Sequence, residues 1–170
     1  MERCEGTERH RSCCIVCGFV LYNNPYPVVV ATVVDGDRAL FVKRARSPEK
    51  GCWSMPGGYM EMDEPPEVGA ARELTEETGL EVDPADLTFV GTIYEPLEDG
   101  TAVVDIVFAT PREKVHGEPI AGDDVVEVAF WPRERIAEEP WDLRAGDVTP
   151  ILWAIDELGK PKAERDTVFW

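Results

Sequence analysis

The feature that most constrains how this chain can fold is an acidic run near its middle. Residues 58–80 read GYMEMDEPPEVGAARELTEETGL, with two prolines ahead of a stretch rich in helix-forming residues. Proline is tolerated in a first helical turn because the N–H groups there have no intrahelical partner, and glycine commonly ends a helix. The run therefore predicts a helix from Pro65 to Thr78 that stops at Gly79.

Three glutamates of this helix share one face. At about 100° per residue, Glu73, Glu76 and Glu77 fall within a sector of roughly 100°, opposite an apolar stripe that can pack on a core. Like charges one turn apart destabilise a helix, so this face needs compensation. A hard divalent cation such as Mg²⁺ supplies it through carboxylate oxygens, and Gly69 on the same face leaves room for the ion.

The helix belongs to a longer pattern of fixed positions. In chain order these are Gly58, Glu64, Arg72, Glu73, Glu76, Glu77 and Gly79, with an aliphatic residue at positions 74 and 80. This pattern resembles the Nudix box and is complete, which argues against the alternative of a solvated acidic face. The flanking runs KRARSPEKGCWSMPGG and GEPIAGDDVVEVAFWP resemble the same family, so the likeness covers about residues 25–137. It implies an α/β/α sandwich with a mixed central sheet.

The resemblance also implies hydrolysis, dependent on Mg²⁺ or Mn²⁺, of a nucleoside diphosphate linked to another moiety. The metal residues that it implies are Gly57 and Gly58, through a backbone carbonyl, and Glu64, Glu73, Glu76 and Glu77. Among these, Glu73 and Glu77 are expected to be inner ligands, and Glu64 to support a ligand. Glu76 is either a further ligand or the base for the attacking water. Two ions about 4 Å apart would bind both the attacking and the leaving oxygen.

The catalytic set implied by the resemblance adds one arginine to the acids. It consists of Glu73, Glu76, Glu77 and Arg72. Arg72 is expected to pair with a box glutamate and fix its rotamer, whereas a plain surface ion pair would contribute under about 1 kcal/mol. A further base or ligand is expected from a downstream loop, where Glu118, Asp124 and Glu127 are the candidates.

A basic island precedes the box. The eight residues KRARSPEK begin at Lys43, and Arg44 and Arg46 are candidates to hold the phosphates or terminal ribose of a substrate. Trp53 is a candidate to stack on a nucleobase, because flat π-faces accept any base. Each has a plainer alternative, since surface arginines and core tryptophans are common.

The N-terminus raises a separate question. The run CIVCG, Cys14 to Gly18, resembles the second knuckle of the zinc ribbon that precedes NADH-pyrophosphatase-type domains, but the first knuckle is missing. A structural zinc takes four N or S ligands, so the candidate set is Cys4, His10, Cys14 and Cys17. The alternative is a decayed ribbon without metal. The predicted organisation is a ribbon-like segment 1–24, a hydrolase domain 25–160 and a tail 161–170.

Hydrophobic patterning predicts the remaining elements. A hairpin turning at Asp35-Gly36 is expected within residues 27–45. Further strands are expected at 87–95, 101–110 and 125–132, and helices at 133–137 and 148–158. Strands mixed with helices in this order favour an α/β sandwich.

Charge and apolar runs limit the partners. The 170 residues include 34 acidic and 17 basic ones, a net charge of −17, which disfavours nucleic acid as a partner. No apolar run reaches about 18 residues and no hydrophobic signal region is present, so we expect no membrane partner and a cytoplasmic location. The same acidity predicts adaptation to high salt. The sequence leaves a homodimer open.

The expected substrate depends on the residues after the box. NADH pyrophosphatases carry a Ser-Gln-Pro-Trp-Pro-Phe-Pro array there, and nothing after Leu80 resembles it. ADP-ribose pyrophosphatases tend to have a proline about sixteen residues past the box, where Pro96 lies. The resemblance therefore implies ADP-ribose or a related nucleotide sugar as the small-molecule substrate. A nucleoside triphosphate and a non-catalytic ligand sensor are the alternatives, although sensors usually lose box glutamates.

Overall fold

The computed structural model describes residues 2–3, 11–47 and 49–159, and its centre is a seven-stranded mixed sheet. Five strands follow the order β12-β5-β4-β10-β9, with β6 added to β5 and β7 added to β4. β4 and β10 run parallel, whereas β5 and β9 are antiparallel to their neighbours. The strands are β4 (Tyr26–Asp35), β5 (Arg38–Arg44), β6 (Trp53–Ser54), β7 (Gly57–Tyr59), β9 (Thr88–Pro96), β10 (Ala102–Pro111) and β12 (Val125–Pro132).

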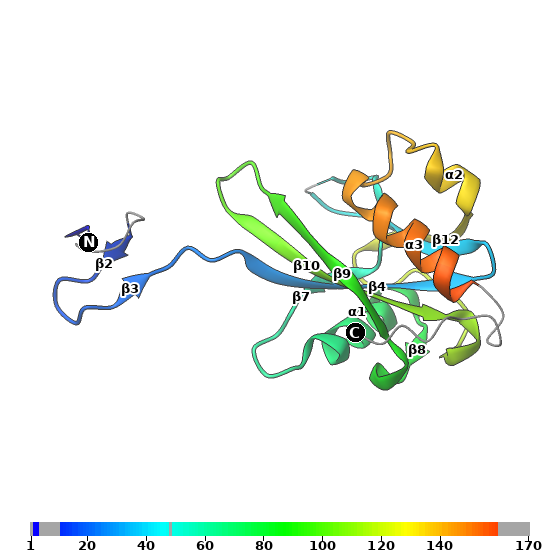
Figure 1. Cartoon of the computed structure of the whole chain (residues 1–170), viewed down its shortest axis with the longest axis horizontal. Helices are drawn as coiled ribbons and strands as arrows, with labels where there is room; N and C mark the ends of the chain where they lie inside the picture. Colours follow the sequence, from blue (N-terminus) through cyan, green and yellow to red (C-terminus); the bar gives the residue numbers. More distant parts are fainter. Residues whose placement is uncertain (1, 4–10, 48, 160–170) are drawn as a thin grey trace.

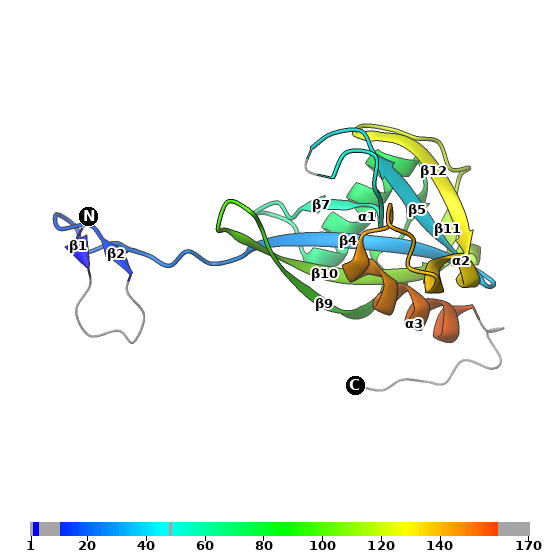
Figure 2. The same cartoon turned by 90° about the horizontal axis from the view of Figure 1, so that it is seen from above.

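Helices cover both faces of this sheet. α1 (Pro66–Thr78) lies on one face, and α2 (Arg133–Ala137) and α3 (Val148–Leu158) lie on the other, as Figures 1 and 2 show. This arrangement explains why the central strand β4 reads as a nearly continuous apolar run, since both of its faces are buried. The predicted α/β/α sandwich is confirmed.

Two hydrophobic cores result, one on each side of the sheet. The core under α1 contains Val29, Leu40, Leu74 and Leu80, all with 0% exposure. The core under α2 and α3 is larger and is built around Phe41, Trp53, Trp131, Ile136 and Ile151. The aromatic rings of Trp53 and Trp131 pack with their centroids 5.0 Å apart.

The helix boundaries agree with the sequence patterns. α1 begins after Pro65 and ends at Gly79, which adopts the left-handed conformation (φ 68°) and donates its N–H to the carbonyl of Thr75. The hairpin β4–β5 turns through Gly36, whose φ of 63° is left-handed as the predicted turn requires. The short helix at 133–137 and the final helix at 148–158 have the predicted bounds.

Smaller elements complete the fold. β8 (Glu81–Val82) pairs with β11 (Val115–His116) beyond the end of α1. Short 3-10 helices are η1 (Pro84–Asp86), η2 (Arg112–Lys114) and η3 (Ala145–Asp147). Within the parts of the chain that the structure describes, no helix has the length and apolar character needed to cross a membrane.

The N-terminal residues form a separate small sheet. β1 (Glu2–Arg3), β2 (Ser12–Cys13) and β3 (Val20–Leu21) pair in that order. Figure 1 shows them apart from the main body, joined to it by the extended chain that leads into β4. Several apolar side chains of this arm are exposed, among them Val16 at 89% and Phe19 at 66%. The division into a ribbon-like segment, a domain and a tail stays a prediction.

Candidate active site

The corner between α1 and β7 brings the box residues together. α1 packs its small and apolar side on the sheet, with Ala70 and Leu74 fully buried. Its glutamates are left at the edge of this contact, beside the glycine-rich backbone of β7. Charged side chains and backbone amides therefore meet where the helix crosses the end of the short strand.

Arg72 is the centre of the charged network in this corner. Its Nε and Nη2 donate to the two carboxylate oxygens of Glu64 at 3.1 and 2.6 Å, a bidentate pair. Its Nη1 donates to Glu73 at 2.7 Å and to Glu76 at 3.1 Å. Pairing with one box glutamate was expected from the sequence, and the structure shows three. One guanidinium thus offsets the repulsion among three carboxylates.

The pKa values of the glutamates that pair with Arg72 shift in different directions. Hydrogen bonds from Arg72 lower the pKa of Glu64, and the backbone N–H of Glu61 adds to the effect. Burial raises the pKa of Glu73 even though Arg72 acts in the opposite direction. Glu64 is thus held firmly as an anion, whereas Glu73 lies where additional positive charge would stabilise its ionised form.

Glu77 lies in the same corner but has a different partner. Its Oε2 accepts a hydrogen bond from the backbone N–H of Gly57 at 3.0 Å. Burial raises the pKa of Glu77 to about 7, the Gly57 N–H opposes this rise, and the charge of Glu73 adds to it. A half-buried carboxylate near a second carboxylate is an arrangement that a bound cation stabilises.

Two glycines allow this close packing. A Cβ at Gly58 would lie 2.6 Å from Oε1 of Glu73, and a Cβ at Gly57 would lie 2.4 Å from the carbonyl oxygen of Val29. The backbone of β7 therefore lies close to the Glu73 carboxylate at Gly58 and close to β4 at Gly57.

Gly69 has a different role from the one predicted. We expected it to leave room for an ion on the acidic face, but it is buried, and a Cβ there would meet Glu64 Oε1 at 2.6 Å and Val29 Cγ2 at 3.1 Å. The space at Gly69 is filled by the Glu64 carboxylate. Because Gly69 has no side chain, the Glu64 carboxylate can occupy this space and pair with Arg72.

The residues in this corner fit a divalent cation. Glu73, Glu77 and the β7 carbonyls are hard oxygen donors, and the approach at Gly58 is one that a Cβ would block. Across residues 2–3, 11–47 and 49–159, no three His, Cys, Asp or Glu side chains converge tightly enough to form a complete cage. Arg72 pairs with Glu64, Glu73 and Glu76, whereas Glu77 accepts from the Gly57 N–H. Glu73 and Glu77 are the carboxylates that would hold Mg²⁺ or Mn²⁺, with a carbonyl of Gly57 or Gly58.

The basic candidates lie at different distances from this corner. Burial raises the pKa of Glu77, and Arg44, at the end of β5, is close enough for its positive charge to oppose this rise. Arg46 is 73% exposed and pairs with Asp124 at 2.9 Å on the surface. Arg44 is therefore the arginine that the structure brings to the box.

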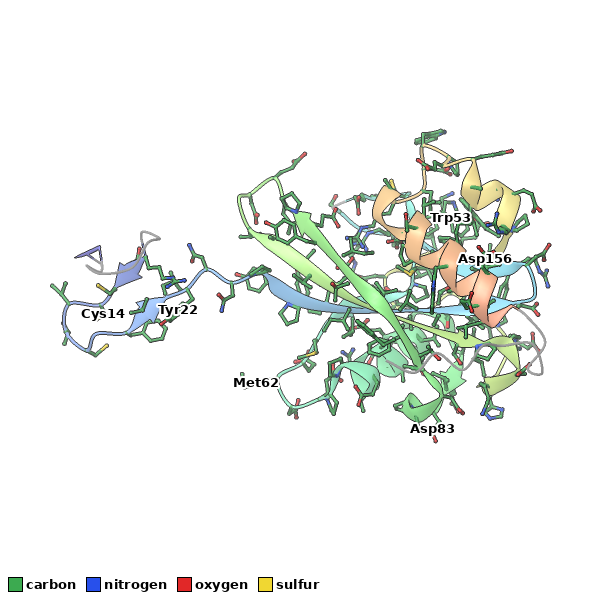
Figure 3. The ribbon with its side chains drawn as sticks, viewed as in Figure 1. Cys14, Tyr22, Trp53, Met62, Asp83 and Asp156 are labelled. Carbon is green, nitrogen blue, oxygen red and sulfur yellow. The ribbon has the colours of Figure 1, made fainter. Side chains whose placement is uncertain are left out.

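Trp53 is placed in the core. Its side chain is 4% exposed, and its ring contacts Trp131 with Lys43 Nζ 5.6 Å from its centroid. Almost none of the ring is exposed for stacking on a nucleobase, so we do not retain it as a substrate-binding residue. Figure 3 shows Trp53 in the main body, well away from Cys14 and Tyr22 on the N-terminal arm.

The downstream loop brings an acid that sequence reasoning missed. Residues 117–124 contact the end of α1, where the N–H of Gly122 donates to the carbonyl of Glu77 at 3.0 Å. Asp123 follows Gly122 in this contact, and its charge adds to the burial that raises the pKa of Glu77. Asp124 pairs with Arg46, and Glu118 is 89% exposed. The sequence signal for this acid is the Asp123-Asp124 pair after Gly122, of which the sequence-based candidates include only Asp124.

The proposed zinc ligands are only partly described. Cys4 and His10 lie outside the described residues. Cys14 and Cys17 flank a tight turn in which Gly18 donates to the carbonyl of Cys14 at 2.9 Å. Hydrogen bonds involving the Cys17 and Val16 backbone lower the pKa of Cys14, which favours the thiolate that metals bind. Zinc at this turn stays a prediction.

Comparison with known proteins agrees with this geometry. The family model described as "NUDIX domain" matches residues 25–153. An ADP-ribose pyrophosphatase of Methanocaldococcus jannaschii is 33% identical over 123 residues, covering 72% of this chain and 70% of that protein. The NAD-capped RNA hydrolase NudC of Pseudomonas aeruginosa is 31% identical and covers 82% of this chain, which spans about half (52%) of NudC.

Solved structures show the same fold. A NUDIX hydrolase from Nitrosomonas europaea superposes with a TM-score of 0.69 at 25% identity, covering 92% of this chain and 84% of that one. The chain belongs to the NUDIX family, and thereby to the pyrophosphohydrolases that act on phosphoanhydride bonds.

Proposed function

We propose that this protein hydrolyses the pyrophosphate bond of a nucleoside diphosphate derivative, with ADP-ribose or a related nucleotide sugar as its substrate. The observation that carries this proposal is the α1–β7 corner, where Glu77 is held by the Gly57 N–H beside Glu73. The similarity to an ADP-ribose pyrophosphatase supports the substrate class. The position of Pro96 past the box is consistent with it.

The reaction requires charge neutralisation around the phosphates. Phosphoanhydrides resist water because their anionic oxygens repel a nucleophile, and a divalent cation bound here would neutralise that charge and activate water. In our proposal, Glu73 and Glu77 hold the cation, and Arg44 binds a phosphate of the substrate. Arg72 fixes the rotamers of the acids around it.

Two acids are candidates for the general base. Glu76 is the more exposed of the two Arg72 partners on α1, with 47% side-chain exposure against 13% for Glu73, so water can reach it. Asp123 lies across the corner on the loop that contacts the end of α1. Replacing each with the isosteric amide separates them, because removing the base lowers turnover by about 10²- to 10⁴-fold.

A substrate panel tests the proposal. The purified protein is incubated with ADP-ribose, NADH or a deoxynucleoside triphosphate, with Mg²⁺, Mn²⁺ or EDTA, and products are separated by chromatography. We expect metal-dependent conversion of ADP-ribose to AMP and ribose 5-phosphate. Preferential release of pyrophosphate from the triphosphate would show that the substrate class is wrong. Turnover of none of the compounds would favour a ligand sensor.

A further inference from the structure

A second charged cluster lies on the opposite side of the sheet, under α3. Arg144 Nη1 donates to Asp105 Oδ2 at 2.7 Å and lies 3.7 Å from Asp147 Oδ1, and its Nη2 pairs with Glu95. The side chains of Asp105 and Asp147 have 0% exposure. Buried carboxylates are costly unless they serve as acceptors for specific donors, so the position of each one calls for a reason.

Asp147 is the last residue of η3 and directly precedes α3. An aspartate at such a position commonly caps its own helix, but here no side-chain cap hydrogen bond is present. Its Oδ2 accepts instead from the backbone N–H of Met55 at 2.8 Å, across 92 positions of sequence. This buried bond links the start of α3 to the strand segment that leads into β7.

Backbone hydrogen bonds join the same segment to the residues that precede α3. The N–H of Trp53 donates to the carbonyl of Asp142 at 2.6 Å, and the N–H of Arg144 donates to the carbonyl of Trp53 at 3.0 Å. Two residues beyond Met55, the N–H of Gly57 donates to Glu77. Residues 53–57 therefore bridge the cluster under α3 and the carboxylates of α1. Within this bridge Asp147 holds the N–H of Met55, and the next carbonyl, that of Pro56, accepts from the N–H of Ala31 on β4 at 2.9 Å.

We propose that Asp147 is a positioning residue for the metal site: by accepting the Met55 N–H, it sets the path of residues 55–57, so that Gly57 is aligned with Glu77. This inference rests on the proposed function of that corner. Arg144 compensates the charge of Asp147 and connects it to β9 and β10 through Glu95 and Asp105. Asp147 touches neither cation nor substrate, and acts through the backbone.

Three variants separate positioning from burial or charge. Asp147→Ala removes the acceptor of the Met55 N–H, and Asp147→Asn keeps an acceptor oxygen but removes the charge. Asp105→Ala is the matched control, because Asp105 is equally buried and shares Arg144 but makes no bond to residues 53–57. Mn²⁺ affinity is measured without substrate by calorimetry, and exchange of the Gly57 amide is measured by NMR in the metal-free proteins.

We expect Asp147→Ala to weaken Mn²⁺ binding by about 10- to 100-fold, the usual effect of losing a residue that orients a metal ligand. Its Gly57 amide should exchange at least about 10-fold faster, whereas Asp147→Asn and Asp105→Ala should stay within about 3-fold of the parent in both measurements. If Asp147→Ala does not fold, Asp147→Asn becomes the deciding variant. A large loss of Mn²⁺ affinity in Asp147→Asn would show that the charge of Asp147 matters and its acceptor oxygen does not, which would contradict the inference.

The inference is wrong if Asp147→Ala leaves Gly57 exchange unchanged, or if Asp105→Ala weakens Mn²⁺ binding as much as Asp147→Ala does. A parent protein that binds no Mn²⁺ would instead overturn the proposed function. The Gly57 exchange rates would still decide whether Asp147 positions this segment, because they are measured without metal.

Discussion

At the scale of single residues, one arginine organises the acidic face of α1. Arg72 binds both oxygens of Glu64 and also reaches Glu73 and Glu76. A cation that binds Glu73 must therefore compete with Arg72 or share this carboxylate with it. The arginine keeps the acids arranged while no ion is bound, which reduces the reorganisation that binding requires.

Arg72→Lys tests this role. A lysine ammonium is a point charge and cannot pair bidentately with Glu64 while also contacting Glu73. We expect the free energy of unfolding in EDTA to fall by about 1–3 kcal/mol, the scale of lost charged hydrogen bonds. Chemical denaturation measures it. The control is Arg46→Lys in the exposed pair with Asp124, for which we expect a change below about 0.5 kcal/mol. Equal losses in the two variants would contradict the role given to Arg72.

The pKa of Glu77 gives a pH-dependent signature. Burial raises it to about 7 from an ordinary value of 4.5, so the folded, metal-free protein holds this proton more tightly than the unfolded chain does. The protonated form favours folding below pH 4.5, and this contribution is lost as the pH rises towards 7. Relative to the parent in EDTA, Glu77→Gln should therefore gain stability between pH 4.5 and 7, by at most about 3 kcal/mol.

Thermal unfolding of the two proteins across this pH range measures the difference. Saturating Mg²⁺ is the control, because a bound cation should hold Glu77 ionised in the parent and reverse the order of stability. A difference between parent and variant that does not change with pH would show that Glu77 titrates as it does in the unfolded chain.

At the scale of elements, much of the fold was predictable from the sequence. Proline and glycine marked both ends of α1, and the Asp-Gly pair marked the β4–β5 turn, because these residues act through local backbone preferences. Proline likewise preceded α2, at Pro132, and glycine followed α3, at Gly159. Predictions of this kind succeed when the information lies within a few residues of the element.

The details of the site were less predictable because they depend on tertiary packing. Helix geometry predicted that three glutamates share one face. It did not predict that Glu77 would contact Gly57 while Glu73 contacts Arg72. Sequence could not show that Trp53 would be buried against Trp131, nor which member of the Asp123-Asp124 pair would approach Glu77. These outcomes follow from strand register and loop docking, which link residues distant in sequence.

The loop after β11 provides an element-scale test. A Cβ at Gly122 would lie 2.4 Å from the carbonyl oxygen of Glu76, which is backbone and cannot rotate away. Gly122→Ala should therefore push residues 117–124 off the end of α1 and lower the unfolding free energy by about 1–3 kcal/mol. Gly91→Ala on β9 is the control, because nothing lies within 4 Å of that Cβ. If both variants unfold alike, the loop does not contact the helix as described.

At the scale of the whole molecule, the charge of −17 sets a problem for an enzyme with an anionic substrate. Long-range repulsion disfavours the approach of a pyrophosphate group, so local positive charge must overcome it. In this fold the local charge is Arg44 beside the box together with the cation that the α1–β7 corner is suited to hold. The adaptation to high salt expected from the same charge stays a prediction.

The central claim is that the acidic face of α1 is a metal-dependent catalytic site. The most direct test compares Glu77→Gln with the parent for turnover of ADP-ribose at saturating Mg²⁺, alongside stability in EDTA at pH 7.5. The account predicts turnover lower by about 10²- to 10⁴-fold, or roughly 3 to 5 kcal/mol, with no loss of stability, because a transition-state interaction is removed while helix propensity is kept. Parental turnover by the folded variant would contradict the claim.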